Sequence, residues 1–326
     1  MDKNIFLILL ALTFSTYRCN AGNISEYKKV TSDKTIIKEI RDVKNFNAVT
    51  IIGNYNIVYT QGNTYKVEVE APHNIMEKIT TIVKDGTLTI SPKKIAGVKV
   101  ISNTKNEGEV TITVTSPTLT KAVLMGSGDF ISNNTVEGKH LQIIILGSGN
   151  MVFQEISYNN ITATVNGNGD LMLHKITASR SANIMLNGSG DFSIGQLSTS
   201  SASISLNGSG DMNIKNLESR IANLKSNGSG DLKLSAIKAQ QVIAAMHGSG
   251  DTSIHLIRCE NLNCKTIGSG EMNISGTTNI YMKSEVSRGK IRDNKLEYNK
   301  LFNIKTHVNQ QKPVVPISPV PIEAQP

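Results

Sequence analysis

A carboxylate recurs at a nearly constant spacing through the second half of the chain, each time directly after a glycine. If the repeats stack, these side chains form one column, in which neighbours about 5 Å apart repel each other unless they are bonded or neutralised. Each carboxylate either caps its own turn by accepting backbone N–H groups or helps to bind a cation. The column comprises Asp129, Asp170, Asp191, Asp211, Asp231, Asp251 and Glu271.

Turn capping is the interpretation we favour for this column. Calcium takes about six to eight oxygen ligands, whereas the column offers one carboxylate per repeat of about 20 residues. Calcium-binding β-rolls use related Gly/Asp chemistry but place several ligands on each much shorter turn. Cation binding by the carboxylate column is therefore the less favoured interpretation. We expect neither a bound metal nor a cofactor.

The histidines of the repeat region form no recognisable catalytic group. His140, His174, His247 and His255 make no arrangement with Ser and Asp that exceeds chance. Polysaccharide lyases and hydrolases built on β-helices need a break in the repeat, where paired carboxylates or a basic residue meet in a cleft. Here the acidic residues follow the repeat, and no irregular insertion creates a cleft. We expect no catalytic residue and no enzymatic activity.

The cysteines predict thiols rather than a metal site. Cys19 lies in an expected signal peptide, so Cys259 and Cys264 remain in the mature chain. The apolar pattern points Cys264 into the core and leaves Cys259 in a turn, which favours two unpaired thiols, although an exported pair could form a disulfide. No Cys/His spacing typical of metal ligands occurs.

The repeat that positions these side chains is a turn, Gly-x-Gly-Asp, that occurs eight times at intervals of 20 or 21 residues. Both glycines are expected to adopt positive φ, as a sharp corner between strands requires. Asn166, Asn187, Asn207 and Asn227 precede four of the turns and can stack as an amide ladder, and residues 287–290 form a degenerate ninth copy. The turn glycines are Gly126, Gly128, Gly147, Gly149, Gly167, Gly169, Gly188, Gly190, Gly208, Gly210, Gly228, Gly230, Gly248, Gly250, Gly268 and Gly270.

Between the turns, apolar residues alternate with polar ones in the period of two that is typical of a strand with one buried face. In one coil the inward positions are Phe192, Ile194, Leu197, Ala202, Ile204 and Leu206. Each unit should hold two or three short strands, and stacking the units satisfies backbone groups that a single unit leaves exposed. We predict an all-β fold, a single-stranded right-handed parallel β-helix (solenoid) with about 20 residues per coil.

The N-terminus predicts export. Lys3 precedes an apolar run from Ile5 to Phe14, and small residues end the segment at Ala21. This is the pattern of a signal peptide at residues 1–21, cut after Ala21. The run is too short to span a bilayer as a stable helix, so we do not expect an integral membrane protein.

The rest of the chain divides into less regular coils, caps and a tail. Asp85-Gly86 predicts a tight turn within residues 40–120, which are expected to continue the solenoid as earlier coils. Prolines after residue 312 favour an extended, disordered tail that cannot join a sheet. The predicted segments are 22–45 as a leader or N-terminal cap, 46–290 as the β-helix with regular repeats over 120–290, 291–306 as a C-terminal cap, and 307–326 as the tail.

Composition restricts the core and the partners. Aromatic residues make up 5 % and Trp is absent, so the core should be aliphatic. The formal charge of +8 favours anionic partners such as acidic glycans, although a solvated basic surface explains it equally. No Lys/Arg cluster with interleaved aromatics is present, so no nucleic-acid partner is expected. The oligomeric state is left open.

The signal peptide followed by strand–Gly-Ser-Gly-Asp–strand units resembles the head GIN domain family of auto-transporter adhesins. The resemblance covers roughly residues 40–290, while Asn150, Asn168 and Glu271 vary the motif. It implies a bacterial exported β-helix at the periplasm or the cell surface. The expected function is adhesin-like binding of a polymeric envelope ligand such as a glycan. Alternatives are a purely structural periplasmic role and, less favoured, a polysaccharide-acting enzyme.

Overall fold

The computed structural model describes residues 35–93 and 110–303. The expected signal peptide (1–21), the Pro-rich tail (307–326), and residues 22–34 and 304–306 of the expected caps lie outside the described residues. About 73 % of the structure is strand, and the stacked strands make a parallel β-solenoid of about 9 turns with roughly 20 residues per turn. The predicted fold class is confirmed.

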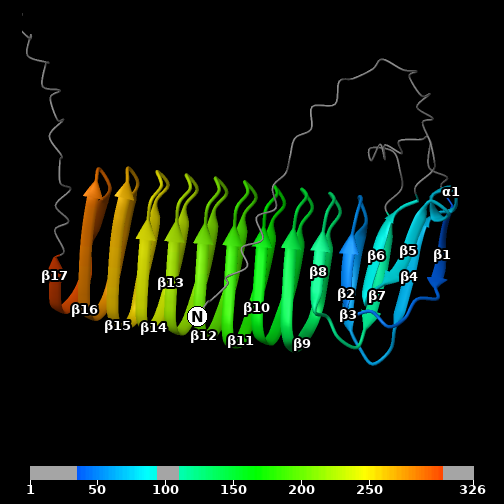
Figure 1. The fold of residues 1–326 in the computed structure, drawn as a ribbon, viewed down its shortest axis with the longest axis horizontal. Coiled ribbons are helices and arrows are strands. Elements are labelled where there is room, and N and C mark those ends of the chain that lie inside the picture. Colours follow the sequence, from blue (N-terminus) through cyan, green and yellow to red (C-terminus); the bar gives the residue numbers. More distant parts are fainter. Residues whose placement is uncertain (1–34, 94–109, 304–326) are drawn as a thin grey trace, which may run out of the picture.

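Within these ranges, long strands stacked side by side form the body of the rod, and each runs parallel to the next (Figure 1). Each is one rung of the solenoid, and consecutive rungs share an extensive backbone ladder. The rungs are β9 (Phe130–Ile145), β10 (Met151–Val165), β11 (Leu171–Leu186), β12 (Phe192–Leu206), β13 (Met212–Ser226), β14 (Leu232–Met246), β15 (Thr252–Gly268), β16 (Glu271–Ser287) and β17 (Lys290–Asn303).

One strand runs through each coil, where the sequence predicted two or three short strands. β12, for example, is a single strand of 15 residues. Its corners appear only as a change in side-chain alternation: Phe192 and Ile194 point inward two residues apart, but the next inward residue is Leu197, three further on. Neighbouring rungs bend at the same places, and the ladder resumes after each corner, where the pairing skips a residue or shifts its register.

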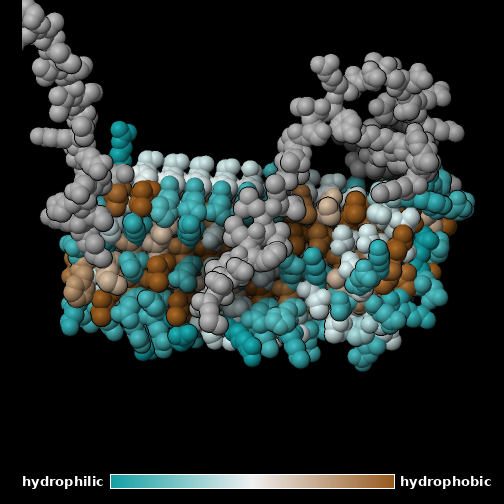
Figure 2. Space-filling view, in the orientation of Figure 1, coloured by the Kyte–Doolittle hydropathy of each residue, from teal (hydrophilic) through white to brown (hydrophobic). Residues whose placement is uncertain are grey.

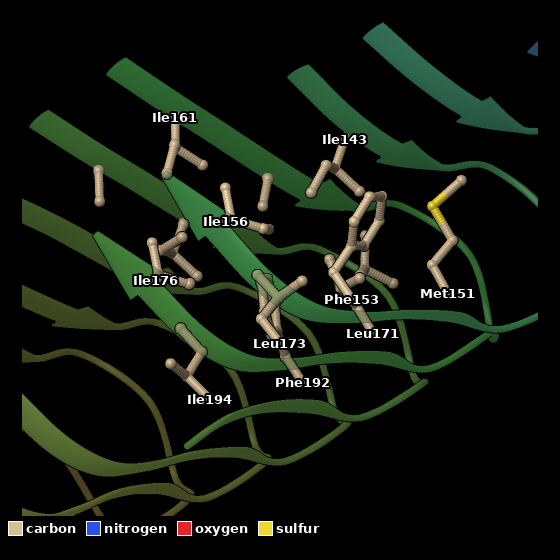
Figure 3. Packing of buried hydrophobic residues seen from close by; sticks show 14 of the residues in the cluster. Ile143, Met151, Phe153, Ile156, Ile161, Leu171, Leu173, Ile176, Phe192 and Ile194 are labelled. Carbon is tan, nitrogen blue, oxygen red and sulfur yellow. The ribbon is translucent and has the colours of Figure 1, made fainter. Parts of the chain in front are cut away.

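The inward positions are those that the alternation predicted. All six inward residues named above for one coil are at most 1 % exposed. Like positions stack from rung to rung, as the column Phe153, Leu173 and Ile194 shows (Figure 3). The core is mainly aliphatic, with an aromatic stack near the N-terminal end, where ring centroids lie 5.9 Å apart for Tyr59–Phe130 and 5.3 Å apart for Phe130–Phe153.

The first rungs are assembled from separate chain segments rather than from successive coils. β2 (Ala48–Ile51) lies between β6 (Thr87–Pro92) and β8 (Lys121–Leu124), parallel to both. β3 (Asn56–Gln61) lies between β7 (Thr111–Ser116) and β9, again parallel to both. The strands of residues 40–93 and 110–120 thus belong to the same sheet, but the chain re-enters it out of sequence order.

Antiparallel strands close this end of the sheet. β4 (Lys66–Pro72) pairs antiparallel with β1 (Ile36–Arg41) and with β7. A short helix, α1 (His73–Met76), leads to β5 (Ile79–Lys84), which pairs antiparallel with β6. The turn predicted at Asp85-Gly86 joins β5 to β6 and is confirmed, with φ of 49° and 71°, the left-handed values that a type I′ hairpin turn requires.

At the opposite end of the rod, one core position is polar. Lys283 takes the inward position that Cys264 holds one rung earlier. Its Nζ lies 3.1 Å from Asp293 Oδ2 and 3.6 Å from Glu285 Oε1, while Met272, Ile274 and Tyr281 of the same rung stay buried. Residues 290–303 form the final described rung, β17, and the capping role expected for residues 291–306 stays a prediction.

Candidate binding ridge

The turn glycines stack directly on one another along one edge of the rod, which we call the ridge. A Cβ on Gly188 would lie 1.8 Å from the backbone oxygen of Gly167, and a Cβ on Gly208 would lie 1.8 Å from that of Gly188. Among the sixteen turn glycines, all within the described chain, only Gly268 has a φ in the left-handed range, at 156°. The expectation of positive φ is therefore wrong, and glycine is required because neighbouring turns approach too closely for a side chain.

The carboxylates link each turn to the next. Oδ1 of Asp191 accepts the backbone N–H of Asp211 at 2.9 Å, and Oδ1 of Asp211 accepts that of Asp231 at 2.8 Å. The same bond joins the other neighbours from Asp170 to Glu271. Each Asp therefore caps the turn of the following rung, and the prediction that it caps its own turn is wrong in this respect.

Both ends of this column have polar partners. At the N-terminal end Asp129 Oδ1 accepts the backbone N–H of Asn150, whose own Oδ1 accepts that of Asp170. At the C-terminal end Arg292 donates to both Glu271 oxygens, at 2.6 and 2.7 Å. This guanidinium lowers the pKa of the Glu271 carboxyl below its ordinary value, chiefly through the hydrogen bond.

Within residues 35–93 and 110–303, no three His, Cys, Asp or Glu side chains are grouped so that they could hold a metal ion. The column offers at most one carboxylate per rung. Each Asp is engaged through one oxygen and Glu271 through both. Cation binding by this column stays a prediction.

An amide column runs beside the glycines, as the sequence predicted. Asn187 Nδ2 donates to Asn166 Oδ1 at 2.7 Å, Asn207 Nδ2 donates to Asn187 Oδ1 at 2.7 Å, and Asn227 Nδ2 donates to Asn207 Oδ1 at 2.6 Å. His247 continues the column, with Nδ1 3.2 Å from Asn227 Oδ1. Because that oxygen accepts, Nδ1 of His247 carries the proton.

A hydroxyl column lies on the other side of the same glycines. Serine follows the first glycine in most turns, and Ser189, Ser209, Ser229, Ser249 and Ser269 are all exposed. In Figure 2 the turns appear as a pale band along the upper edge of the rod.

Together the two columns make a shallow groove. Its floor is the backbone of the first glycines, and its walls are the amides and hydroxyls of the rungs from Asn187 to Ser269. The groove has a volume of about 780 Å³, and Arg288 lies at its C-terminal end. Sequence reasoning missed it, although the recurring Asn-Gly-Ser tripeptide was its signal.

Each rung of the groove keeps hydrogen-bonding capacity for a ligand. A side-chain amide has two N–H donors and an oxygen with two lone pairs. Asn207 uses one donor and one lone pair within its column, and so does Asn187. One donor and one acceptor therefore remain on each of these amides. The serine hydroxyls of the two rungs, Ser189 and Ser209, lie 3.4 Å apart and share one hydrogen bond, so each keeps further hydrogen-bonding capacity.

The other histidines lie far apart: His140 is on a column of its own, and His174 and His255 share a column but are four rungs apart. His140 contacts Asn160, with 3.3 Å between Nδ1 and Nδ2, and His255 Nδ1 lies 2.9 Å from Ser275 Oγ. His174 occupies a third rung, in β11. The structure thus does not bring the histidines together.

The cysteines are free and buried. Cys264 lies in the core as predicted, but Cys259 is not in a turn: it points inward from β15, and its thiol donates to the Asn261 carbonyl at 3.3 Å. Burial raises the pKa of both thiols, which makes them poor nucleophiles.

The sequence matches the model of one protein family, described as "Putative auto-transporter adhesin, head GIN domain", over residues 45–226 and 216–302. No curated protein matches the chain. None of the helices within the described ranges is long and apolar enough to cross a membrane.

Several solved structures have the same fold. A "putative adhesin" from Parabacteroides merdae gives a TM-score of 0.61 at 20 % identity, covering 81 % of this chain and 98 % of that chain. A "putative adhesin" from Parabacteroides distasonis gives 0.60 at 22 %, covering 81 % and 99 %. A "putative lipid binding protein" from the same species gives 0.56 at 21 %, covering 84 % and 99 %. At these identities the likeness concerns the fold alone.

Proposed function

We propose, because the chain belongs to the head GIN domain family, that it is an exported, non-enzymatic, adhesin-like protein of the cell envelope. Its ligand is an extended polar polymer such as a glycan, held along the ridge groove. The family match and the adhesin-named structures support the adhesin-like role. The glycan and the groove are our own assignment.

One observation carries this assignment: an asparagine amide with a spare donor and a spare acceptor recurs at the rungs of Asn187, Asn207 and Asn227, and a serine hydroxyl recurs at all five rungs of the groove. Sugar hydroxyls both donate and accept, so a spare amide donor, a spare amide acceptor and a serine hydroxyl suit them. The glycine floor lets a ligand approach the backbone, because no side chain stands between the walls at Gly188, Gly208 or Gly228.

The spacing of the rungs suits a polymer more than a small molecule. Paired strands lie about 4.8 Å apart, which is close to the length of one sugar ring in an extended chain. A neutral hydrogen bond contributes only about 0.5–1.5 kcal/mol, so one rung binds weakly. Several rungs that engage one chain together raise the affinity, because each contact holds the next sugar near its site.

The test is binding of labelled neutral oligosaccharides to the full chain and to Asn207→Leu. Leucine suits this column, because Leu146 occupies the same position at an earlier rung. Asn207→Leu should lower the affinity several-fold. The loss of its two exposed column hydrogen bonds should lower the melting temperature by only a few degrees, so the variant stays folded in the assay. Gln240→Leu, an exposed change at another corner of the rod, is the control and should bind as the parent does.

A purely structural envelope role predicts a different result. In that case no oligosaccharide binds, or Asn207→Leu binds as well as the parent chain. Either outcome would refute the proposal that the ridge groove binds a glycan.

A further inference from the structure

One end of the ridge groove carries a permanent positive charge. Ser287 pairs with Gly268 and Lys290 pairs with Glu271, so Arg288 stands at the position that Ser269 holds one rung earlier. Its side chain is exposed and lines the groove together with His247 and the serines. The repeat has thus exchanged a hydroxyl for a guanidinium at its last turn.

This charge is free for a ligand. No carboxylate of the described residues lies within 4.0 Å of the Arg288 guanidinium. Arg292, in contrast, is held by both oxygens of Glu271. The remaining groove walls, apart from His247, consist of neutral amides and hydroxyls.

The ridge differs on the two rungs that precede the groove, which begins at Asn187. There Asn168 stands where later rungs have serine, and Leu146 replaces asparagine in the amide column. Leu146 is 45 % exposed. The two ends of the groove therefore differ: a cation lies at its C-terminal end, and the ridge beyond its N-terminal end carries an amide and then an apolar side chain.

We propose that the ligand is an acidic glycan, bound with an oxyanion, either a carboxylate or a sulfate, against Arg288. This rests on the proposed function and names the ligand class of the same groove. A guanidinium suits such a group because its planar donors can form two parallel bonds to one oxyanion. The net charge of +8 favours the approach of an acidic chain.

The groove also limits the useful length of the ligand. It spans about five rungs, or roughly 20 Å at about 4.8 Å per rung. Affinity should therefore rise with chain length up to about four or five sugars and then level off.

The experiment compares two oligosaccharides of equal length, one ending in a uronic acid and one in the corresponding neutral sugar, by titration calorimetry. The full chain should bind the acidic ligand roughly tenfold more tightly, and the preference should fall with added salt. Arg288→Ser, which restores the residue of the other rungs, should remove the preference, so that the acidic and the neutral ligand bind alike. Arg288→Lys should keep part of it, and the control Arg258→Gln should keep all of it.

The outcomes separate the two proposals. If the full chain binds both ligands equally, or if Arg288→Ser keeps the preference, the role of Arg288 is refuted while ridge binding stands. If neither ligand binds, both proposals fail. Added inorganic sulfate that competes only with the acidic ligand would support an oxyanion site at Arg288.

Discussion

Replacing a turn glycine by alanine should separate two rungs. At Gly208 the new Cβ would lie 1.8 Å from the backbone oxygen of Gly188, where about 3.4 Å is needed for ordinary contact. The obstacle is backbone, so no side chain can rotate away. The turns can part only by stretching the bonds Ser209 N–H to Gly188 O (3.1 Å) and Asp211 N–H to Asp191 Oδ1 (2.9 Å).

The cost follows from these contacts. Overpacking a rigid site costs about 1–3 kcal/mol, and each lost hydrogen bond about 1 kcal/mol. We expect Gly208→Ala to lower the free energy of unfolding by roughly 3–5 kcal/mol. Urea unfolding followed by far-ultraviolet circular dichroism measures this loss, with Ser209→Ala in the same turn as the control.

A second substitution distinguishes close approach from backbone conformation. If the glycine were needed for a left-handed φ, Gly208→Asn would be tolerated better than Gly208→Ala, because Asn adopts that region more readily. If close approach decides, both variants lose stability alike. A Gly208→Ala chain within about 0.5 kcal/mol of the parent would refute the reasoning.

The remaining predictions concern the carboxylates, the core and the location. Asp211→Ala should lower the free energy of unfolding by about 1 kcal/mol, because the Asp231 N–H loses its acceptor, whereas Asp211→Asn keeps an acceptor and should be nearly neutral. Added calcium should not shift the melting temperature of the parent chain. A rise of several degrees would support the cation alternative. Arg292 lowers the pKa of Glu271 in the folded chain. The pair therefore stabilises the fold at pH values above the ordinary carboxyl pKa, and this contribution is lost as the pH falls through the lowered pKa. Arg292→Gln should raise the pKa of Glu271 in a pH titration followed by NMR. Leu206→Asp should prevent folding, because Leu206 is fully buried; a soluble folded variant would contradict the inward register. Protease should cleave the chain on intact cells if it lies at the surface, whereas protection until lysis would place it in the periplasm.

The solenoid itself could be predicted because its signals are periodic. The glycine interval gave the coil length, and the period of two gave the inward face, down to residues such as Leu206 and Cys264. The amide ladder followed from four asparagines at one position, since equal positions must stack. The type I′ turn at Asp85-Gly86 needed only local sequence.

Other features depend on contacts between rungs, which periodicity alone does not describe. Within a single turn, a positive φ is the obvious reason for a glycine, so the sequence predicted that conformation. The close approach of Gly188 to Gly167, which is the actual reason, arises only when the rungs stack. For the same reason the carboxylates cap the following rung. The sequence also could not predict that β2 and β3 lie between later strands, because irregular segments lack the repeat that would indicate which strands pair.

The most direct test of the account is an NMR titration of the isotope-labelled chain with a glycan oligosaccharide, observing side-chain amides. The account predicts that the Nδ2 signals of Asn187, Asn207 and Asn227 shift together. Asn279 and Asn299, an amide pair on another edge whose Nδ2–Oδ1 distance is 3.3 Å, should not move. Binding that shifts the Asn279 pair and leaves the ridge amides unmoved, or no shift with either neutral or acidic oligosaccharides, would contradict it.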